Sequence, residues 1–375
     1  MPGERNSLAR RSSPDGGTAG RRRGKGTHMD MTDSALRRTR IRVELGDRSY
    51  PVDIGPGVRH SLPGIVERLG ARRAAVVSAR PDSWIPDAGV PTLVVRARDG
   101  EPDKTLATVE SLCREFVRFG LTRDDVVVSV GGGTTTDVVG LAAALFHRGV
   151  PVVHLPTSLL AQVDASVGGK TAVNTPEGKN LIGAYWQPSA VLCDTDYLET
   201  LPQREMLNGY GEIARCHFIG AGDLRGLPLP EQIAASVARK AWIVSADERD
   251  TGLRHVLNYG HTLGHALELA TDFRLRHGEA VAIGTVFAGR LARALDRIDE
   301  RRAVEHLEVV RHYGLPHELP ADVAPARLIE LMRLDKKATS GLTFVLDGED
   351  GAELVRDLPA AVVARVLAEM PRAAA

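Results

Sequence analysis

Three histidines and a distant glutamate are the residues whose types and spacing most directly suggest chemistry. His261, His265 and His277 lie in one mostly apolar run, residues 257–284, and Glu212 lies in the segment GYGEIARCHFIG. In a helix, residues four apart share a face, so His261 and His265 would point the same way, with His277 about three turns further along. Imidazole nitrogens and a carboxylate are typical ligands of a catalytic Zn²⁺, which usually takes three protein ligands. The pattern therefore predicts a divalent metal site.

Two other interpretations of these histidines remain open. A single helical histidine is more often a core or surface residue than a metal ligand. The H-x-x-x-H spacing of His261 and His265 lacks the glutamate that H-E-x-x-H metalloproteases use as a base, which argues against a protease. Nitrogen and oxygen ligands accept several divalent ions, so the expected ion is zinc or cobalt without a choice between them.

A glycine-rich turn in the first half of the chain predicts a second binding site. A buried strand over residues 126–130 runs into Gly131, Gly132 and Gly133, and a helix is expected to start near Asp137. Such a turn lets a diphosphate approach backbone amides and the positive end of the helix. The turn matches neither G-x-G-x-x-G nor a Walker motif, so it equally suits a plain strand-to-helix turn in which Asp137 caps the helix.

Polar residues concentrate after this turn, in the stretch VVHLPTSLLAQVDASVGGKTAVNTPEGKNLIGAYWQP. Asp164, Lys170, Asn174, Lys179 and Asn180 stand there among glycines and threonines. Such residues destabilise the interior of a helix or strand but suit the binding of phosphate and hydroxyl groups. Each lysine alone is better explained as a solvated surface group, but their clustering favours a site.

Length and composition describe an enzyme-sized globular protein whose partner is a small molecule. The chain has 375 residues, 43% hydrophobic and 26% charged, and its 48 Lys and Arg balance its 48 Asp and Glu. On that balance neither nucleic acid nor an anionic membrane is expected as a partner. Cys113, Cys193 and Cys216 form no C-x-x-C pair, which favours a reducing cytoplasm over a disulfide framework. No apolar stretch approaches the length of a membrane span.

The order of expected elements indicates two domains after a basic tail. Residues 1–38 are rich in Arg, Gly and Ser and lack hydrophobic periodicity, so we predict a disordered segment. Over residues 39–202, strand patterns such as RRAAVVSA alternate with helical ones such as LATVESLCREFVRFG, which predicts an α/β domain with ligands at the carboxyl ends of its strands. Over residues 203–375 the helical period dominates, which predicts an all-α domain.

Together these motifs resemble the sugar phosphate cyclase family, whose central member is 3-dehydroquinate synthase. The resemblance runs from about Arg40 onward. Its blocks are DGEPDK, GGGTTTD, LPTSLLAQVDASVGGKTAVN, GKNLIGAYWQP, DTDYLETLP, NYGHTLGHALE, RHGEAVAIG and DKK near Lys336. The resemblance implies an N-terminal NAD-binding α/β domain, a C-terminal α-helical domain, an active site in the cleft between them, and a homodimer.

The resemblance also implies roles for individual residues. It assigns the metal to Glu212, His261 and His277, and leaves His265 as a catalytic or phosphate-contacting residue. The catalytic group it implies is Lys170, Arg215, Asp250, Arg254, Asn258 and His265. The implied substrate contacts are Arg148, which is expected to reach the neighbouring subunit's phosphate, and Asp164, Lys170, Asn180, Lys240, Arg254, Asn258, His265 and Lys336. The implied NAD contacts are Asp99, Glu101, Lys104, Gly132, Gly133, Asp137, Thr157, Ser158, Lys170, Lys179 and the turn from Tyr197 to Thr200.

The chemistry that the resemblance implies explains this mixture of groups. NAD⁺ oxidises one alcohol of a sugar phosphate, which acidifies the adjacent C–H. Phosphate then leaves, the ketone is reduced again, and the freed enol closes a carbocycle by aldol attack, so NAD is not consumed. The metal acts as a Lewis acid on the hydroxyl being oxidised, while Lys and Arg neutralise phosphate and carboxylate. The departing phosphate can take the proton itself, so no dedicated strong base is expected.

Two residues depart from the usual 3-dehydroquinate synthase pattern. The family usually reads E-x-x-K where this chain has Glu212 to Arg215, and usually has glutamate where this chain has Asp250. Arginine cannot give up its proton and is larger than lysine, so the first change is not neutral at a polar site. Segments such as GEIARCHFIG are most similar to the aminodehydroquinate synthases of the aminoshikimate pathway, which supply the precursor of 3-amino-5-hydroxybenzoate for antibiotics. Lys240 and Arg254, which suit a substrate carboxylate, are both present.

We therefore expect conversion of 4-amino-3,4-dideoxy-arabino-heptulosonate 7-phosphate to 5-amino-5-deoxy-3-dehydroquinate and phosphate. The alternative within the family is 3-dehydroquinate synthase of the shikimate pathway. A glycerol-dehydrogenase-like oxidoreductase would leave Lys170, Lys179 and Asn180 without a task. A metal- and nucleotide-binding regulator without turnover would not need the full set of metal, NAD and anion residues.

Overall fold

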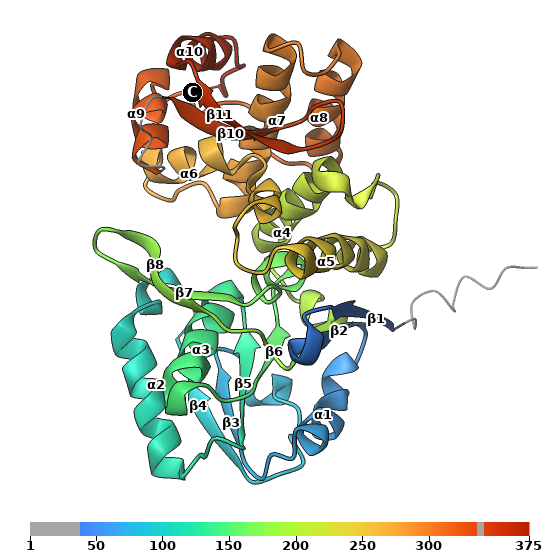
Figure 1. Ribbon diagram of the computed structural model, residues 1–375, viewed down its shortest axis with the longest axis vertical. Helices are drawn as coiled ribbons and strands as arrows, with labels where there is room; N and C mark the ends of the chain where they lie inside the picture. Colours follow the sequence, from blue (N-terminus) through green and yellow to red (C-terminus); the bar gives the residue numbers. More distant parts are fainter. Residues whose placement is uncertain (1–37, 99, 336–340, 375) are drawn as a thin grey trace, which may run out of the picture. The chain divides into compact units, whose positions relative to one another are not determined.

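A seven-stranded sheet forms the base of the first half of the chain (Figure 1). The computed structural model describes residues 38–98, 100–335 and 341–374, so the predicted tail lies outside the described residues except for Arg38. The strand order is β1-β2-β9-β6-β5-β3-β4, with β1 antiparallel to β2 and the other neighbours parallel. The strands are β1 (Thr39–Val43), β2 (Tyr50–Gly55), β3 (Ala74–Ser78), β4 (Thr92–Arg96), β5 (Val126–Gly131), β6 (Val152–Pro156) and β9 (Ala190–Asp194).

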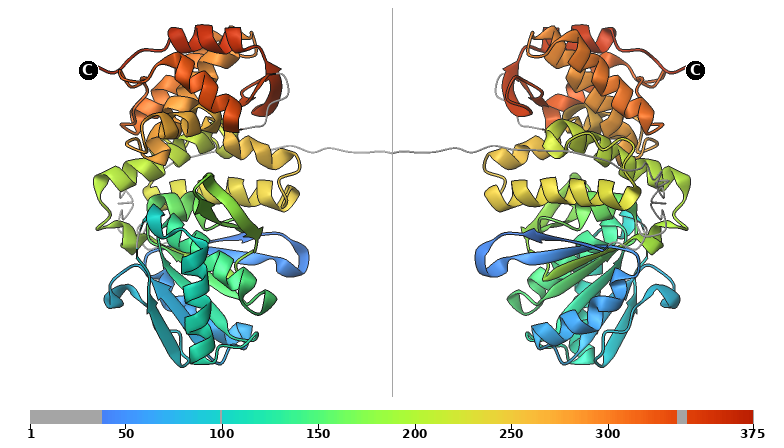
Figure 2. Two further views of the ribbon diagram at one scale, coloured as in Figure 1. Left: turned by 90° about the vertical axis from the view of Figure 1, so that its left-hand side faces the viewer. Right: turned by 90° about the vertical axis from the view of Figure 1, so that its right-hand side faces the viewer.

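Helices cover both faces of this sheet because its central strands are apolar on both sides. In β5, Val126 and Val128 pack in the core under α1, whereas Val127 packs in the core under α2 and α3. Figure 2 shows these helices flanking the sheet from two further directions. The predicted α/β layer is confirmed. The covering helices are α1 (Leu62–Leu69), α2 (Leu106–Phe119) and α3 (Gly133–Leu145).

Between β6 and β9 the chain leaves the sheet and forms two elements that carry predicted site residues. The first is a π-helical turn, Ala161–Ala165, and the second is an antiparallel hairpin of β7 (Lys170–Thr175) and β8 (Gly178–Tyr185). The hairpin packs on α3, where a Cβ on Gly140 would lie only 2.4 Å from Cγ2 of Thr171. The missing side chain at Gly140 therefore permits the close contact that holds the hairpin.

The second half of the chain is mainly helical, as predicted. Helix α7 is almost entirely buried and packs against α4 and α6. A Cβ on Gly211 would lie 2.2 Å from the carbonyl oxygen of Gly278, so only glycine permits the approach of α4 to α7. That approach brings Glu212 beside His277. The helices are α4 (Gln203–Cys216), α5 (Leu229–Ala246), α6 (His261–Ala270), α7 (His277–Ala294), α8 (Glu300–His312), α9 (Pro325–Asp335) and α10 (Ala360–Ala368).

One hairpin is the exception to the all-α prediction for this half. Strands β10 (Leu342–Leu346) and β11 (Glu353–Leu358) pair antiparallel, and Phe344 packs on Phe287 of α7 with ring centroids 5.8 Å apart. The β10 segment, LTFVL, is a short apolar run that periodicity cannot distinguish from a piece of buried helix. Its β-branched and aromatic residues were the available signal for a strand.

The run that carries the three histidines is broken into two helices. Helix α6 ends at Ala270, Asp272 and Phe273 have positive φ angles of 48° and 58°, and α7 begins at His277. The backbone N–H of Arg276 donates to the carboxylate of Glu279 at 2.8 Å, which caps the new helix. Residues 271–276 contain neither Gly nor Pro, so the sequence gave little warning of the break. Because the chain reverses there, His277 returns toward His261.

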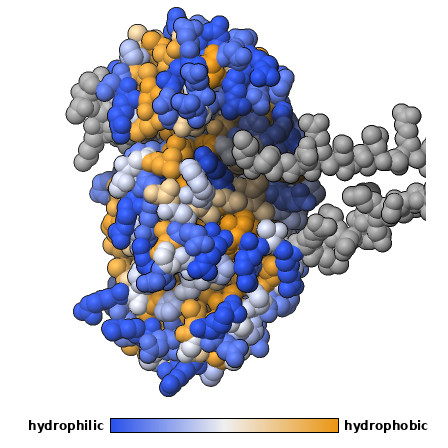
Figure 3. Space-filling view, turned by 45° about the vertical axis from the view of Figure 1, so that its right-hand side comes forward, coloured by the Kyte–Doolittle hydropathy of each residue, from blue (hydrophilic) through white to orange (hydrophobic). Residues whose placement is uncertain are grey.

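The face drawn in Figure 3 shows hydrophilic residues interspersed with smaller apolar areas. Such a mixture is ordinary for a folded domain, since much of any protein surface is apolar. Within the described ranges, no helix combines the length and the apolar character that crossing a membrane requires.

Candidate active site

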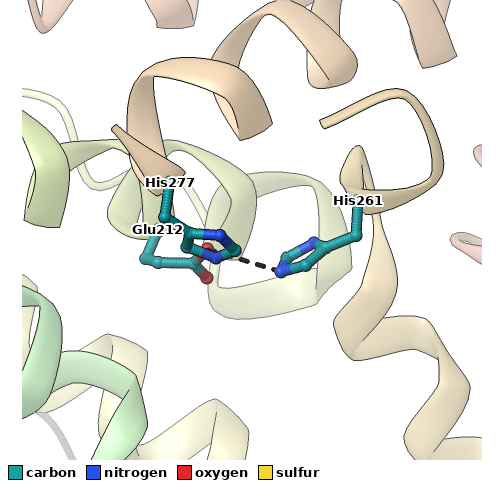
Figure 4. Close-up of side chains that lie close together, drawn as sticks. All are labelled: Glu212, His261 and His277. Atoms are coloured by element: carbon teal, nitrogen blue, oxygen red, sulfur yellow. Dashed lines mark ion pairs between the residues drawn. The ribbon is translucent and has the colours of Figure 1, made fainter. Parts of the chain in front are cut away.

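Glu212, His261 and His277 come together in the structure (Figure 4). Their ligand atoms lie within 4.8 Å of one another. Oε1 of Glu212 lies 3.3 Å from Nε2 of His277 and 3.7 Å from Nε2 of His261. Glu212 is only 1% exposed, and its Oε1 has no hydrogen-bond partner among the described residues. A buried carboxylate oxygen facing two imidazole nitrogens fits a divalent cation.

Each imidazole is oriented by a contact of its other ring nitrogen. Nδ1 of His261 lies 3.0 Å from the carbonyl oxygen of Tyr259, and Nδ1 of His277 lies 3.2 Å from Oε2 of Glu268. Contacts of this kind fix the ring and the tautomer of metal-binding histidines. Sequence reasoning missed Glu268. The available signal was its position three residues after His265, which places both on one face of a helix.

The electrostatics of this group suit a cation. Burial lowers the pKa of His261 to about 3, which keeps its imidazole neutral. Burial also acts to lower the pKa of His277, but hydrogen bonds with Glu212 and Glu268 outweigh it and raise that pKa to about 10. Burial acts to raise the pKa of Glu212, but Arg215 and the two histidines hold it well below its usual value. Ionised carboxylates therefore face both imidazoles.

His265 lies beside this group, on the same face of α6 as His261, as the helical spacing predicted. Its ring centroid is 5.4 Å from that of His261 and 6.2 Å from that of His277. His265, Glu268 and His277 form a second group whose possible ligand atoms lie within 4.8 Å. Of the two groups, the one with Glu212 is the better metal site, because Glu268 already contacts Nδ1 of His277 whereas Oε1 of Glu212 has no such partner among the described residues.

A buried charge cluster adjoins the metal ligand Glu212. Arg215, which is 1% exposed, donates from Nε to Oε2 of Glu212 at 2.5 Å and from NH2 to Oδ1 of Asp164 at 3.3 Å. Lys240 donates from Nζ to the carbonyl oxygen of Asp164 at 2.7 Å and lies 2.8 Å from its Oδ1. Burial acts to raise the pKa of Asp164, but Lys240 and Arg215 lower it overall. The structure thus brings three predicted site residues into contact with the metal group.

The loop of residues 247–254 is organised by the carboxylate of Asp247. That carboxylate accepts hydrogen bonds from the backbone N–H groups of Thr251, Gly252 and Arg254 at 2.9, 2.8 and 3.0 Å, and from the Thr251 hydroxyl at 3.1 Å. These bonds lower the pKa of Asp247, with the bond from Arg254 contributing most. Asp247 was not among the predicted site residues, but it determines where Arg254 begins.

Arg254 and Asp250 face the hairpin side of this loop. Arg254 is 1% exposed and donates to the carbonyl oxygens of Glu248 and Gly168 at 2.5 and 2.7 Å. Its Nε is buried and has no hydrogen-bond partner in the described part of the chain, which suits a bound anion. Asp250 adopts a positive φ of 61° and forms an ion pair with Lys170 of β7. Lys170 and Arg254 are therefore linked to one loop.

The glycine turn after β5 has the form of a diphosphate cradle. A Cβ on Gly131 would lie 2.3 Å from Oγ1 of Thr135, so this position requires glycine. A Cβ on Gly132 would have 3.5 Å to Oγ of Ser158 as its nearest contact, so space lies in front of this residue. Gly132 is the N-cap of α3 and Gly133 its first residue, which places the positive end of the helix at the turn.

Asp137 does not cap α3, in contrast to the alternative drawn from the sequence. It lies in the second turn of the helix, and its Oδ2 accepts a hydrogen bond of 2.6 Å from Nζ of Lys104. Lys104 also donates to Oδ1 of Asn180 at 2.5 Å, so residues from three separate segments meet here. Burial raises the pKa of Asp137 to about 6, although Lys104 acts to lower it. Beside the turn, Oγ1 of Thr157 accepts from Nε of Arg80, a residue that the sequence analysis did not single out.

The remaining predicted residues differ in how closely they adjoin these groups. Lys179 lies 3.4 Å from Oε1 of Glu268 and so reaches the metal group from the hairpin. Glu101 accepts a 2.7 Å hydrogen bond from Nδ2 of Asn174. The Tyr197 hydroxyl is taken up by the fold, since it donates to the carbonyl oxygen of Trp84 at 2.6 Å. Arg148 and Thr200 are exposed, Asn258 is half-buried, and Asp99 and Lys336 lie outside the described residues.

Comparison with known proteins decides the family. A family model described as 3-dehydroquinate synthase N-terminal matches residues 94–208, and one described as 3-dehydroquinate synthase C-terminal matches residues 203–338. The chain belongs to the 3-dehydroquinate synthase family. It is 75% identical over 335 residues to an Amycolatopsis mediterranei (strain S699) protein named "Putative aminodehydroquinate synthase", covering 89% of this chain and 95% of that one. It is 43% identical over 337 residues to 3-dehydroquinate synthase of Nocardia farcinica (strain IFM 10152), covering 83% and 90%.

Two solved structures of sugar phosphate cyclases share the fold of this 3-dehydroquinate synthase family member. A 2-deoxy-scyllo-inosose synthase, complexed with carbaglucose-6-phosphate, NAD⁺ and Co²⁺, aligns with a TM-score of 0.81 at 27% identity, over 88% of this chain and all of that one. The 2-epi-5-epi-valiolone synthase of Streptomyces hygroscopicus subsp. jinggangensis 5008, with NAD⁺ and Zn²⁺ bound, aligns with a TM-score of 0.74 at 27% identity, over 87% and 98%. The expected family and fold are confirmed.

Proposed function

We propose that this enzyme is an aminodehydroquinate synthase. It would convert 4-amino-3,4-dideoxy-arabino-heptulosonate 7-phosphate to 5-amino-5-deoxy-3-dehydroquinate and phosphate, a carbon–oxygen lyase step in antibiotic precursor biosynthesis. The observation that carries the proposal is the buried group of Glu212, His261 and His277 in contact with the charge cluster of Asp164, Arg215 and Lys240. The high identity to the Amycolatopsis protein supports the amino substrate.

The residues present fit both groups that the reaction needs. Glu212, His261 and His277 would hold a divalent zinc or cobalt ion, in line with the donor set and the unpartnered Oε1 of Glu212. The cradle at Gly132 would receive the diphosphate of NAD. When bound, NAD⁺ supplies reversible hydride transfer and the divalent ion supplies Lewis acidity at the hydroxyl that is oxidised.

The chain's own residues would bind and orient the substrate. The buried Nε of Arg254 and the ammonium of Lys240 suit its carboxylate, because both are cations held in place by several contacts. Lys170 is half-exposed beside Asp250 and suits a phosphate or hydroxyl oxygen. The net reaction balances without an external redox partner, because the alcohol that is oxidised is later restored. One C–O bond to phosphate breaks and one C–C bond closes the ring.

We further propose that the enzyme acts in the cytoplasm as a homodimer and binds neither nucleic acid nor membrane. Arg148 is exposed and has a positive φ of 65°, which holds it at the end of a short 3-10 turn rather than inside a helix. In a dimer it would reach the phosphate bound by the neighbouring subunit. Its substitution by alanine would then raise the KM for the substrate without changing the affinity for metal.

The direct test compares two substrates on the purified enzyme loaded with Co²⁺ or Zn²⁺ and NAD⁺. Phosphate release would be measured with the amino heptulosonate 7-phosphate and with its 4-hydroxy counterpart, 3-deoxy-arabino-heptulosonate 7-phosphate. We expect a higher kcat/KM for the amino substrate. A clear preference for the hydroxy substrate would instead identify a 3-dehydroquinate synthase.

A variant separates the site assignment from the substrate assignment. His261→Ala should lose bound metal and phosphate release together, whichever heptulosonate is supplied. Phosphate release that survived the loss of metal would show that the assignment of Glu212, His261 and His277 is wrong, even if the amino substrate were preferred.

A further inference from the structure

Arg215 is one of the most deeply buried large side chains in the described structure, and its guanidinium is used in three directions. Nε donates to Oε2 of Glu212 at 2.5 Å, NH1 donates to the carbonyl oxygen of Leu257 at 2.8 Å, and NH2 donates to Oδ1 of Asp164 at 3.3 Å. With 1% exposure and these acceptors on three separate segments, Arg215 is placed to hold other groups rather than to meet the substrate itself.

The contact with Glu212 divides the two oxygens of that carboxylate between two tasks. Oε2 accepts from Arg215, whereas Oε1 faces Nε2 of His261 and of His277 and has no hydrogen-bond partner among the described residues. We propose that Arg215 is a positioning residue for the metal: by occupying Oε2, it presents Glu212 as a ligand through Oε1 alone. This inference rests on the proposed function only in that the site holds a divalent cation.

The planar guanidinium is what makes this arrangement possible. Arginine carries N–H donors in a rigid fork, so donation to one acceptor sets the direction of the others, whereas a lysine ammonium is a compact charge on a flexible stem. The carbonyl of Leu257 supports the guanidinium from the segment that leads into α6. The position of Glu212 is therefore tied to the backbone that also carries His261.

Arg215 also connects the metal ligand to the substrate side of the site. Asp164 accepts from both Arg215 and Lys240, so two carboxylates and two cations form one buried, formally neutral cluster. Buried charges are tolerated when they are paired in this way, and removing one member leaves another uncompensated. A change at Arg215 that keeps its charge but alters its shape would thus disturb geometry while leaving the charge balance intact.

Arg215→Lys is therefore the test variant, because it keeps the positive charge and is the residue that the family usually has at this position. The metal-free enzyme would be titrated with Co²⁺ in the absence of substrate, following both affinity and the visible absorption spectrum of the bound ion. We expect Arg215→Lys to bind Co²⁺ more weakly, on the order of 10- to 100-fold, which is the usual effect of losing an outer contact to a metal ligand. The spectrum should change as well, because Oε2 of Glu212 becomes able to approach the ion.

Arg40→Lys provides the matched control. Arg40 forms a two-pronged pair with Asp53, from Nε to Oδ1 at 2.6 Å and from NH2 to Oδ2 at 2.9 Å, between β1 and β2. Breaking that fork should leave Co²⁺ affinity and spectrum unchanged. Thermal melting of each metal-free variant would show whether the fold is intact.

A measurement on the unaltered enzyme keeps the inference testable if Arg215→Lys fails to fold. In a crystal structure with Zn²⁺ or Co²⁺, Glu212 should bind the ion through Oε1 only, with Oε2 still on Arg215. Coordination through both oxygens, or equal Co²⁺ affinity and an identical spectrum in Arg215→Lys, would overturn the positioning role while leaving the proposed function untouched. Failure of the unaltered enzyme to bind either ion would overturn the metal site and this inference together.

Discussion

Asp247 offers the sharpest test of how the substrate loop is held. Its Oδ1 accepts from the backbone N–H and hydroxyl of Thr251, and its Oδ2 accepts from the N–H groups of Gly252 and Arg254. Asp247→Asn keeps the shape but leaves only one accepting oxygen, so an amide NH₂ would face two donors. Loss of two hydrogen bonds to a charged acceptor should lower the free energy of unfolding by about 3 kcal/mol.

The same change should impair catalysis, because the loop positions Arg254. Urea unfolding would measure stability, and steady-state phosphate release would measure kinetics. We expect kcat/KM to fall on the order of 10- to 100-fold, the usual effect of misplacing a binding group. The pKa of Asp247 is lowered in the fold, so its contribution to stability is present above the ordinary carboxylate range and is lost as the pH falls. The stability difference from Asp247→Asn should shrink accordingly in acid.

Asp125→Asn is a closely matched control. The Asp125 carboxylate accepts from the backbone N–H groups of Thr122, Arg72 and Arg73 at 2.7, 3.2 and 2.9 Å and from the Thr122 hydroxyl at 2.8 Å, at the amino end of β5. Its loss should lower stability by a similar amount and leave kcat/KM unchanged. If Asp247→Asn had normal kinetics, or if Asp125→Asn impaired them equally, the positioning of Arg254 by Asp247 would be refuted.

Three further predictions concern the cofactor sites. Gly132→Ala should keep normal urea stability, because a Cβ there clears the protein, yet weaken NAD⁺ binding on the order of 10-fold by filling the cradle; equal NAD⁺ affinity in fluorescence titrations would exclude a diphosphate at this turn. Glu268→Gln should weaken Co²⁺ binding on the order of 10-fold in chelator competition, because His277 loses its charged partner; unchanged affinity would contradict that role. The folded pKa of Asp137, about 6, lies above its ordinary 3.8, so its stabilising contribution is present below that range and lost as the pH rises through 6; the urea midpoint of the unaltered protein relative to Asp137→Asn should fall over this window, and a constant difference would argue against it.

The α/β layer and the glycine turn could be predicted from sequence because both depend on local pattern. A buried β-branched run followed by glycines specifies a strand entering a tight turn, and β5 with Gly131 has that form in the structure. The helical spacing of His261 and His265 likewise placed both on one face of α6.

The grouping of Glu212 with His277 could not be predicted from local pattern. It depends on the close approach of α4 and α7 at Gly211 and on the unmarked break after Ala270, both of which are tertiary features. Only the resemblance to a family indicated these three ligands. The partners Glu268 and Lys104 show the same limit, because an ion pair between distant segments leaves no periodic signal in either one.

The most direct test of the proposed chemistry is a crystal structure of the enzyme soaked with Co²⁺ and NAD⁺, with anomalous diffraction recorded at the cobalt edge. The predicted result is one anomalous peak bound by Glu212, His261 and His277, with the nicotinamide beside it and the diphosphate at Gly132. A peak bound by other residues, or a dinucleotide bound away from that turn, would contradict the proposed site.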